Sequence, residues 1–420
     1  MQDGHLSEPA EQPLVPATDP SPQGVPSRVL ILSGEMGEGH NAAAAAITDA
    51  IADVWPGCRV ERFDTLELWG RPFSKVLCRG YEIQMRLLPI TYEVFYDWLC
   101  KSNGFAAVSK AAIGGFFGRR LERYLQTHDA DLIISTYPFG SAALHWLRAH
   151  RDSTVPSVTY VPAFHVHPVW AYAGIDQHYV MYDTAPGHAH TPGFAQTMHV
   201  GAPPVRDGFG TLSKQEARRR LELSDDAFIL LVTGGSWGLG GISDAVRALT
   251  GSGIDVQVHA VCGKSERLHQ HLRDMRIPAE RLRTYGYVNN MPELMSAADV
   301  VVTNGAGVTV LEALQTPRPV IAFQPLAGHG KASTDEMVRR ELALVALDIP
   351  ELVEVTRQLV TDRVLMARME HAGREWTKGR DLRESVRTMT PLYQAPAAAS
   401  TATGTGAEAP VEPPPLLGGP

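Results

Sequence analysis

The strongest constraint on the fold of this chain lies in residues 298–331, where two apolar runs flank a glycine turn and a helical pattern. Val300–Val302 predicts a short buried strand, and Asn304–Gly307 predicts a tight turn. The apolar spacing of Val308–Gln315 predicts a helix, and Val320–Phe323 predicts a second buried strand. Strand, turn, helix and strand in this order form a βαβ unit, whose two strands run parallel.

The turn of this unit has the features of a phosphate site. Glycines let backbone N–H groups approach a phosphate without a Cβ in the way, and the helix that follows presents its positive end there. Glu312 lies one turn into that helix, within reach of a ribose hydroxyl, and a further loop follows the second strand. A glycine turn alone is weak evidence, but the combination predicts half of a nucleotide-sugar site. The donor-binding residues expected in this stretch are Gly305, Ala306, Gly307, Val308, Thr309, Glu312, Gly328, His329 and Lys331.

Composition limits the class of protein. A chain of 420 residues is long enough for two domains with full cores. A net charge of −8 and a pI near 6.1 argue against a nucleic-acid partner. The four cysteines form no CxxC pair, so we expect neither a metal site nor disulfides, and a reducing, cytoplasmic compartment fits. No apolar run approaches the roughly 20 residues of a membrane span, which predicts a protein that is soluble or bound to a membrane surface.

The two ends of the chain differ in composition from the rest. Residues 1–27 are rich in Pro, Gln and Glu, and residues 393–420 are mostly Ala, Pro, Thr and Gly. Neither segment buries enough apolar surface to offset chain entropy, so we expect both to be disordered. A linker at Arg206–Thr211 divides the chain between them into an N-terminal domain, residues 28–208, and a C-terminal domain, residues 209–392.

The first half opens with the apolar run Val29–Leu32, which is typical of a strand in a parallel sheet covered on both faces. A loop with glycines at 34, 37 and 39 follows, and His40 then starts an alanine-rich helix. This spacing does not match the dinucleotide motif, and His40 stands where a P-loop requires lysine. The loop instead presents a histidine above the carboxyl end of a strand, where α/β sheets bind ligands. His40 is therefore our candidate catalytic base, and the alternative is that it only closes the turn.

Two further histidines follow a later strand. His165 and His167 alternate in what reads as an extended segment, which predicts that their side chains point to opposite sides. We therefore expect this pair not to bind a metal.

The stretch from Arg71 to Arg123 differs in character from the rest of the chain. It is rich in aromatic residues and carries nine Lys and Arg against four Asp and Glu, within a protein of net charge −8. Basic residues beside exposed aromatics suit an anionic membrane surface. The alternative, which the sequence supports equally, is that the aromatics are core residues and the arginines form a solvated face.

The second half repeats the pattern of strand and glycine turn. Ala227–Thr233 predicts a buried strand, and residues 234–241 then form a Gly-Gly-Ser turn before a helix. Such a turn cradles a diphosphate through bare N–H groups, a hydroxyl and the helix dipole, and the alternative is a flexible surface loop. Backbone groups at Tyr287 and Val288 are candidates to bracket a base. The additional donor-binding residues expected here are Gly234, Gly235, Ser236, Trp237, Tyr287, Val288 and Met291.

The motifs together resemble a known family. Residues 32–46, with the run GEGHNAAAA, resemble the start of the monogalactosyldiacylglycerol synthase and processive diacylglycerol glucosyltransferase group. Residues 234–236 and 304–312 resemble the donor half of glycosyltransferase family 28. The resemblance spans residues 28–392. It implies an α/β chain with the GT-B fold, in which two Rossmann-like domains face each other across a cleft.

The resemblance also implies roles for single residues. His40 matches the histidine of the family's glycine loop, Glu312 the acid that holds the ribose, and Gly235 and Ser236 the diphosphate turn. The acceptor-side residues that it implies are Gly37, Gly39, Asn41, Pro138, Phe139 and His167.

Two departures from the family pattern stand out. The loop at 329–333 reads His-Gly-Lys-Ala-Ser, where the family usually has a glutamine or glutamate pair followed by asparagine. Residues 162–163 read Pro-Ala, where the family tends to have Thr-Asp before the His-Pro-x-Trp segment at 167–170.

The function implied is inverting transfer of a hexose from a UDP-sugar to a diacylglycerol-type lipid acceptor, with no metal and no cofactor. The expected partners are the UDP-sugar, the lipid acceptor and an anionic membrane surface, with the protein peripheral on the cytoplasmic inner face of the cell membrane. Inverting transfer needs a base for the acceptor hydroxyl, for which His40 is the candidate, and N–H dipoles for the leaving diphosphate. Two alternatives stay open: a non-catalytic nucleotide-sugar sensor, favoured by Ala163, and a UDP-sugar 2-epimerase.

Overall fold

The computed structural model describes residues 25–36, 38–183, 191, 193–235, 238, 240–305 and 307–393. The predictions for the chain ends at residues 1–24 and 394–420 lie outside this part of the chain. So do four of the expected site residues, which are Gly37, Ser236, Trp237 and Ala306.

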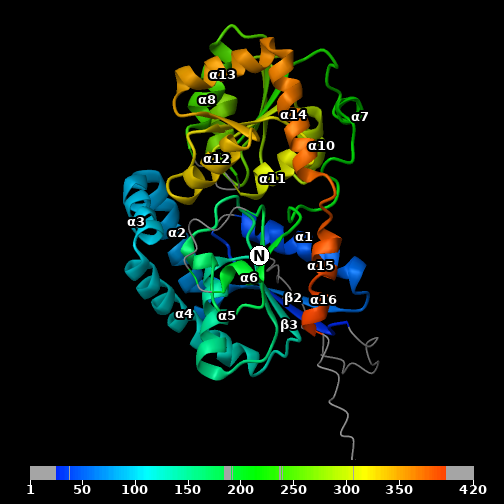
Figure 1. Ribbon diagram of the computed structural model, residues 1–420. Coiled ribbons are helices and arrows are strands. Elements are labelled where there is room, and N and C mark those ends of the chain that lie inside the picture. Colours follow the sequence, from blue (N-terminus) through cyan, green and yellow to red (C-terminus); the bar gives the residue numbers. More distant parts are fainter. Residues whose placement is uncertain are drawn as a thin grey trace, which may run out of the picture.

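The chain forms two α/β domains, each built on a six-stranded parallel sheet (Figure 1). The first sheet has the order β2-β1-β3-β4-β5-β6 and the second the order β12-β11-β10-β7-β8-β9. The first sheet comprises β1 (Arg28–Ser33), β2 (Arg59–Asp64), β3 (Leu132–Ser135), β4 (Ser157–Tyr160), β5 (Gln177–Val180) and β6 (Met198–Val200). The second comprises β7 (Ile229–Thr233), β8 (Gln257–Val261), β9 (Leu282–Tyr285), β10 (Val300–Thr303), β11 (Val320–Phe323) and β12 (Ala343–Ala346).

The central strands of both sheets are apolar and buried over almost their whole length, because helices cover both faces. The helices of the first domain are α1 (Gly39–Val54), α2 (Arg71–Leu87), α3 (Pro89–Lys101), α4 (Asn103–Leu125), α5 (Pro138–Arg151) and α6 (Phe194–Thr197), with 3₁₀ turns at Thr65–Trp69 and Pro168–Trp170. The later helices are α7 (Lys214–Arg220), α8 (Ile242–Gly251), α9 (Glu266–Asp274), α10 (Met291–Ala297), α11 (Val308–Gln315), α12 (His329–Arg339), α13 (Ile349–Thr361), α14 (Arg363–Thr377), α15 (Leu382–Arg387) and α16 (Thr390–Tyr393).

The structure confirms the βαβ unit predicted at residues 298–331. Strands β10 and β11 pair in parallel, with Val301 opposite Val320, and α11 has the predicted bounds. Helix α5 begins at Pro138, and proline is accepted there because the first helical residue needs no N–H bond. The loop after β11 ends at Gly328, since α12 begins at His329.

The end of the described chain returns from the second domain to the first. Helix α15 packs on α1, and Figure 1 shows the orange-red α15 beside the blue α1. Arg383 of α15 forms ion pairs with Asp53 (2.6 Å) and Asp207 (2.7 Å). Tyr179 of β5 adds a hydroxyl contact of 2.7 Å with Thr388. Residues 382–393, which the sequence pattern grouped with the second domain, therefore pack against the first.

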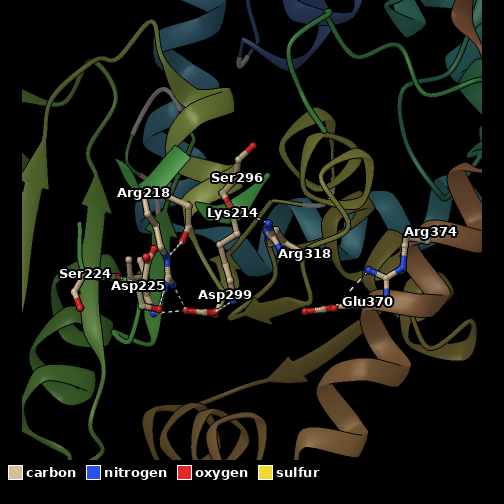
Figure 2. Close-up of polar contacts among 11 residues, drawn as sticks. Lys214, Arg218, Ser224, Asp225, Ser296, Asp299, Arg318, Glu370 and Arg374 are labelled. Carbon is tan, nitrogen blue, oxygen red and sulfur yellow. Dashed lines mark hydrogen bonds and ion pairs between the residues drawn. The ribbon is translucent and has the colours of Figure 1, made fainter. Parts of the chain in front are cut away.

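A buried ion cluster holds the amino ends of β7 and β10 together (Figure 2). The Asp299 carboxylate accepts hydrogen bonds from Arg218 Nη2 (2.8 Å), Lys214 Nζ (2.8 Å) and the backbone N–H of Ile229 (2.6 Å). The Arg218 guanidinium also donates to the Ala297 carbonyl (3.0 Å). Every charge in the cluster has partners, as burial requires. It lies at the end of the sheet opposite to the loops described below.

We predict that Asp299→Ala lowers the free energy of unfolding by about 3–5 kcal/mol, because it leaves the buried Arg218 guanidinium without its counter-charge. Denaturant titration followed by fluorescence and circular dichroism measures the change. The control is Asp255→Ala, since the Asp255 side chain is fully exposed and lies 4.0 Å from Arg281. Equal stabilities of the two variants would contradict the importance of the cluster.

Candidate functional site

The two sheets turn their topological switch points toward each other. In the first sheet the chain goes from β1 to β2 on one side, and β3 then lies on the other side of β1. In the second sheet β8 lies on one side of β7 and β10 on the other. The helical connections on the two sides of β1, and of β7, therefore run in opposite directions. Such points are where open α/β sheets bind ligands, at the carboxyl ends of the strands. The helices that start there, α1 and α11, approach each other: a Cβ built on Gly39 would lie 4.0 Å from Val308. Figure 1 shows α11 at the lower end of the upper domain, facing α1.

His40 lies at this meeting point, in the first turn of α1. Its Nδ1 is 2.6 Å from the carbonyl oxygen of Thr136, at the end of the neighbouring strand β3. A carbonyl only accepts, so Nδ1 carries the proton and Nε2 of the neutral ring keeps its lone pair. Desolvation lowers the pKa of His40 to about 4. The hydrogen bond to Thr136 raises this pKa by a smaller amount, and electrostatic repulsion from His329 lowers it further. The ring is thus an oriented, uncharged base near neutral pH.

Aromatic rings form the wall around His40. Tyr137 meets the imidazole edge-on at 5.0 Å between ring centroids, and Trp170 lies at 6.0 Å. Phe139, in the first turn of α5, packs on Tyr137 at 5.1 Å. The remaining expected acceptor-side residues that the structure describes lie at the starts of helices α1 and α5 and in the segment before the Pro168 turn; they are Gly39, Asn41, Pro138 and His167.

The predicted arrangement of His165 and His167 was wrong. Both imidazoles lie against one ring, that of Tyr96 in α3, with centroid distances of 6.1 and 5.7 Å. The segment is irregular and not a strand, so the alternation of an extended chain does not apply. Within the described residues, no three His, Cys, Asp or Glu side chains are placed to hold a metal ion.

The glycine turns of the second domain are built alike. After β7 the Gly235 N–H donates to Thr233 Oγ1 (3.3 Å), and after β10 the Gly305 N–H donates to Thr303 Oγ1 (3.2 Å). A threonine at each strand end thus closes its turn at the switch point. The expected donor residues Gly234, Gly235, Gly305, Gly307, Val308 and Thr309 all lie in these two turns and the helix start that follows the second.

Glu312 lies on α11, one turn beyond the second glycine turn, and is half-buried. Burial raises the pKa of its carboxyl group to about 8, against a smaller lowering by the charge of Arg206. Because this pKa lies close to neutral pH, a ligand that donates a hydrogen bond to the carboxylate favours its charged form.

The residues expected around a base lie in the connection after β9. Tyr287 is 62% exposed, whereas Val288 and Met291 pack against the core. Lys264 lies over the Tyr287 ring at 5.7 Å and forms an ion pair with Glu38 of the first domain. This contact joins the two domains near His40, which follows Glu38 by two residues.

The start of α12 also joins the two domains. His329 Nδ1 lies 3.2 Å from the hydroxyl of Tyr92, and Lys331 forms an ion pair of 3.0 Å with Glu93, both on α3. Gly328 has a φ of +69°, and a Cβ there would lie 2.8 Å from Tyr92, so only glycine fits this contact. Two of the residues expected to bind the donor therefore hold α3.

A cleft of about 570 Å³ opens between the helices α2 and α3 and the second domain. Of its lining residues, sequence reasoning selected Lys331 but not the others, because the approach of the others depends on how the domains meet. They include Met85, Arg86, Gly240, Gln324, Leu326 and Leu347.

Comparison with known families supports the sequence resemblance. Residues 40–197 match the family described as monogalactosyldiacylglycerol (MGDG) synthase, and residues 229–348 match the glycosyltransferase family 28 C-terminal domain. A processive diacylglycerol beta-glucosyltransferase from Bacillus cytotoxicus is 26% identical over 365 residues, which cover 82% of this chain and 88% of that protein.

Solved structures share the architecture. MurG from Acinetobacter baumannii has a TM-score of 0.55 at 14% identity, covering 87% of this chain and 99% of its own. HepE from Anabaena, in complex with UDP and glucose, has a TM-score of 0.52 at 12% identity, covering 86% and 98%. These likenesses establish the fold, which is the two-domain GT-B fold.

We predict that Glu312→Gln gains stability relative to the unsubstituted protein as the pH rises from 5 to 9. The folded-state pKa of about 8 exceeds the ordinary 4.5, so between these values the folded protein holds the extra proton. The stability from this group is fully present below pH 4.5 and is lost as the pH rises through 8. Denaturant midpoints across this range measure the difference. The exposed Glu280→Gln is the control, and parallel curves for both variants would exclude the raised pKa.

Proposed function

We propose that this chain, which belongs to the monogalactosyldiacylglycerol synthase and processive diacylglycerol glucosyltransferase group of glycosyltransferase family 28, transfers a hexose from a UDP-sugar to a diacylglycerol-type lipid, with inversion at the anomeric carbon. The group membership and the GT-B fold make it a lipid glycosyltransferase. The proposal extends to the donor, the stereochemistry and the catalytic residue.

The observation that carries the proposal is the bond between His40 Nδ1 and the Thr136 carbonyl. It fixes the ring and leaves Nε2 free to accept the proton of an acceptor hydroxyl as that oxygen attacks the sugar. A general base needs an uncharged ring and a fixed direction, and His40 has both. The carbonyl here takes the orienting role that a carboxylate has in other histidine bases.

The donor half of the proposal rests on the two glycine turns. The backbone N–H group at Gly307 would stabilise the diphosphate as the sugar leaves, next to the positive end of α11. Gly235, whose N–H is bound to Thr233, would let the diphosphate approach the other turn because it carries no Cβ. Glu312 would accept a hydrogen bond from the ribose, and backbone groups at Tyr287 and Val288 would bracket the base. HepE, whose fold is similar, is in complex with UDP and glucose, which supports a UDP-sugar donor.

Ala163 does not favour the non-catalytic alternative. The residue is half-buried and packs against the apolar cluster that contains Trp170. Because Thr136 already orients His40, an aspartate at this position is not needed for the base to work. Epimerase activity has no specific support in the structure.

The acceptor side of the molecule offers an apolar surface. No helix in the described part of the chain is both long and apolar enough to cross a membrane. Most of the exposed large apolar side chains lie on α2, α3 and α4 or between α2 and α3. These helices also carry the excess of basic residues, so this region suits an anionic lipid surface better than open water. The exposed apolar side chains are Val76, Ile83, Leu87, Leu88, Ile90, Val94, Phe95, Trp98, Val108 and Phe116. We propose that the protein is peripheral at the inner face of the cell membrane, and this surface supports the proposal.

The direct test of catalysis is UDP release from UDP-glucose, UDP-galactose and UDP-N-acetylglucosamine, with and without diacylglycerol vesicles. We predict that His40→Ala lowers turnover by about 10²–10⁴-fold, the usual range for a general base, with little change in UDP affinity. The matched control is His145→Ala, because His145 Nδ1 is also bound to a backbone carbonyl, that of Ala173, at 2.7 Å. Full activity of the His40 variant would make this residue structural.

We further predict binding to anionic vesicles that weakens with salt, since charge attraction between exposed groups is screened over roughly 10 Å at 0.1 M. Replacing Leu87, Ile90 and Trp98 by serine should reduce co-sedimentation. Val364→Ser on α14 is the control, because Val364 is 78% exposed but lies on the second domain. Equal binding to neutral and anionic vesicles, or no effect of the triple substitution, would count against this surface.

A further inference from the structure

The backbone at Gln324 has a conformation that the fold does not explain. Among the described residues, five other than glycine have a positive φ, and four of them directly follow the last turn of a helix, where a left-handed residue is common. These four are Asp152, Glu222, Arg276 and Glu341. Gln324, with a φ of +45°, instead follows strand β11. Backbone strain of this kind gathers at functional sites.

The surroundings of Gln324 hold its backbone and leave its side chain exposed. Its N–H donates to the Ala346 carbonyl at 2.9 Å, so the main chain is anchored to the neighbouring strand β12. Its side chain lies on the wall of the 570 Å³ cleft, opposite α2 and α3. A Cβ built on Gly241 would lie 2.7 Å from Gln324 Oε1, so the glycine makes room for the amide.

Gln324 also lies beside the proposed diphosphate turn. Two residues further, the Leu326 N–H donates to the Asn304 carbonyl at 3.1 Å, which ties this loop to the turn after β10. Gly240, from the turn after β7, lines the same cleft. A hexose is attached to the second phosphate of its nucleotide, so it must lie next to these turns.

The residues at the start of α12 are already engaged. His329 contacts Tyr92, Lys331 pairs with Glu93, and Ser333 Oγ accepts the His165 N–H at 3.1 Å. Each of these contacts crosses to the first domain. Side chains that already make these contacts are poorly placed to hydrogen-bond to sugar hydroxyls. The Gln324 amide offers both a donor and an acceptor, and a hydroxyl group can use both.

From these observations we infer that the Gln324 amide hydrogen-bonds to the hexose hydroxyls of the nucleotide-sugar donor, and that His329 and Lys331 join the domains instead. The inference rests on the proposed function, because it assigns the sugar-binding part of the same site. It makes Gln324 the determinant of which hexose is transferred.

The test compares two substitutions. Gln324→Met keeps the length of the side chain and removes the amide. Gln324→Asn keeps an amide and suits a left-handed backbone, since asparagine adopts it more readily than most residues. Calorimetry measures the affinities for UDP, UDP-glucose, UDP-galactose and UDP-N-acetylglucosamine, and UDP release gives kcat/KM for each sugar.

For the methionine variant, the preferred UDP-sugar should lose about 5- to 100-fold in affinity and kcat/KM, while UDP itself binds as before. The asparagine variant should shift the preference among the three sugars. His329→Ala and Lys331→Ala should change all three donors alike.

Unchanged sugar ratios in both Gln324 variants would overturn the inference, as would a changed ratio in the His329 or Lys331 variant. Measuring UDP-sugar binding without turnover tests the role of Gln324 separately from the proposed transferase activity. Wild-type protein that prefers one UDP-sugar without turning it over would refute the transferase, and the Gln324 variants would still decide the inference.

Discussion

The site depends on the unbroken parallel pairing of β1 with β3 and of β7 with β10. Parallel strands end at the same edge of a sheet, and only where the connections diverge does a gap open between the loops. In the first domain His40 uses that gap to reach the carbonyl of Thr136 at the end of the neighbouring strand. In the second domain the two glycine turns line it. The ion cluster of Asp299 and Arg218 holds the second pair of strands at its other end, so register errors there would displace the turns.

The elements of this pairing could be predicted from the sequence because each carries its own local signal. The apolar runs of β10 and β11 and the spacing of α11 lie within 24 residues, and their predicted bounds agree with the structure to within one residue. The same holds for the loop that presents His40 at a helix start. Local patterns of this kind report on burial, and the short length, β-branched residues and flanking Gly and Pro residues of these runs favour strands over helices.

Features that depend on contacts between distant residues were not predictable in the same way. His165 and His167 meet the same Tyr96 ring because α3 lies across an irregular segment, and no local period encodes that. The return of α15 to the first domain depends on Arg383 meeting Asp53, which is 330 residues away in sequence. The engagement of His329 with Tyr92 spans 237 residues. Gln324 was missed because its signal is a backbone angle, which the sequence does not display.

Burial shifts the pKa values of His40 and Glu312 so that both side chains favour their uncharged forms. The pKa of His40 falls to about 4 and that of Glu312 rises to about 8, in each case mainly because desolvation disfavours the charged form. At neutral pH the site without ligand therefore holds an uncharged imidazole and a largely protonated carboxyl group. A bound diphosphate brings negative charge into this poorly solvated space, where its field acts over a longer range than in water. That field would raise the pKa of His40 and so strengthen it as a base only once the donor is in place. Proton removal from the acceptor would thus be coupled to donor binding by electrostatics, without a change in fold.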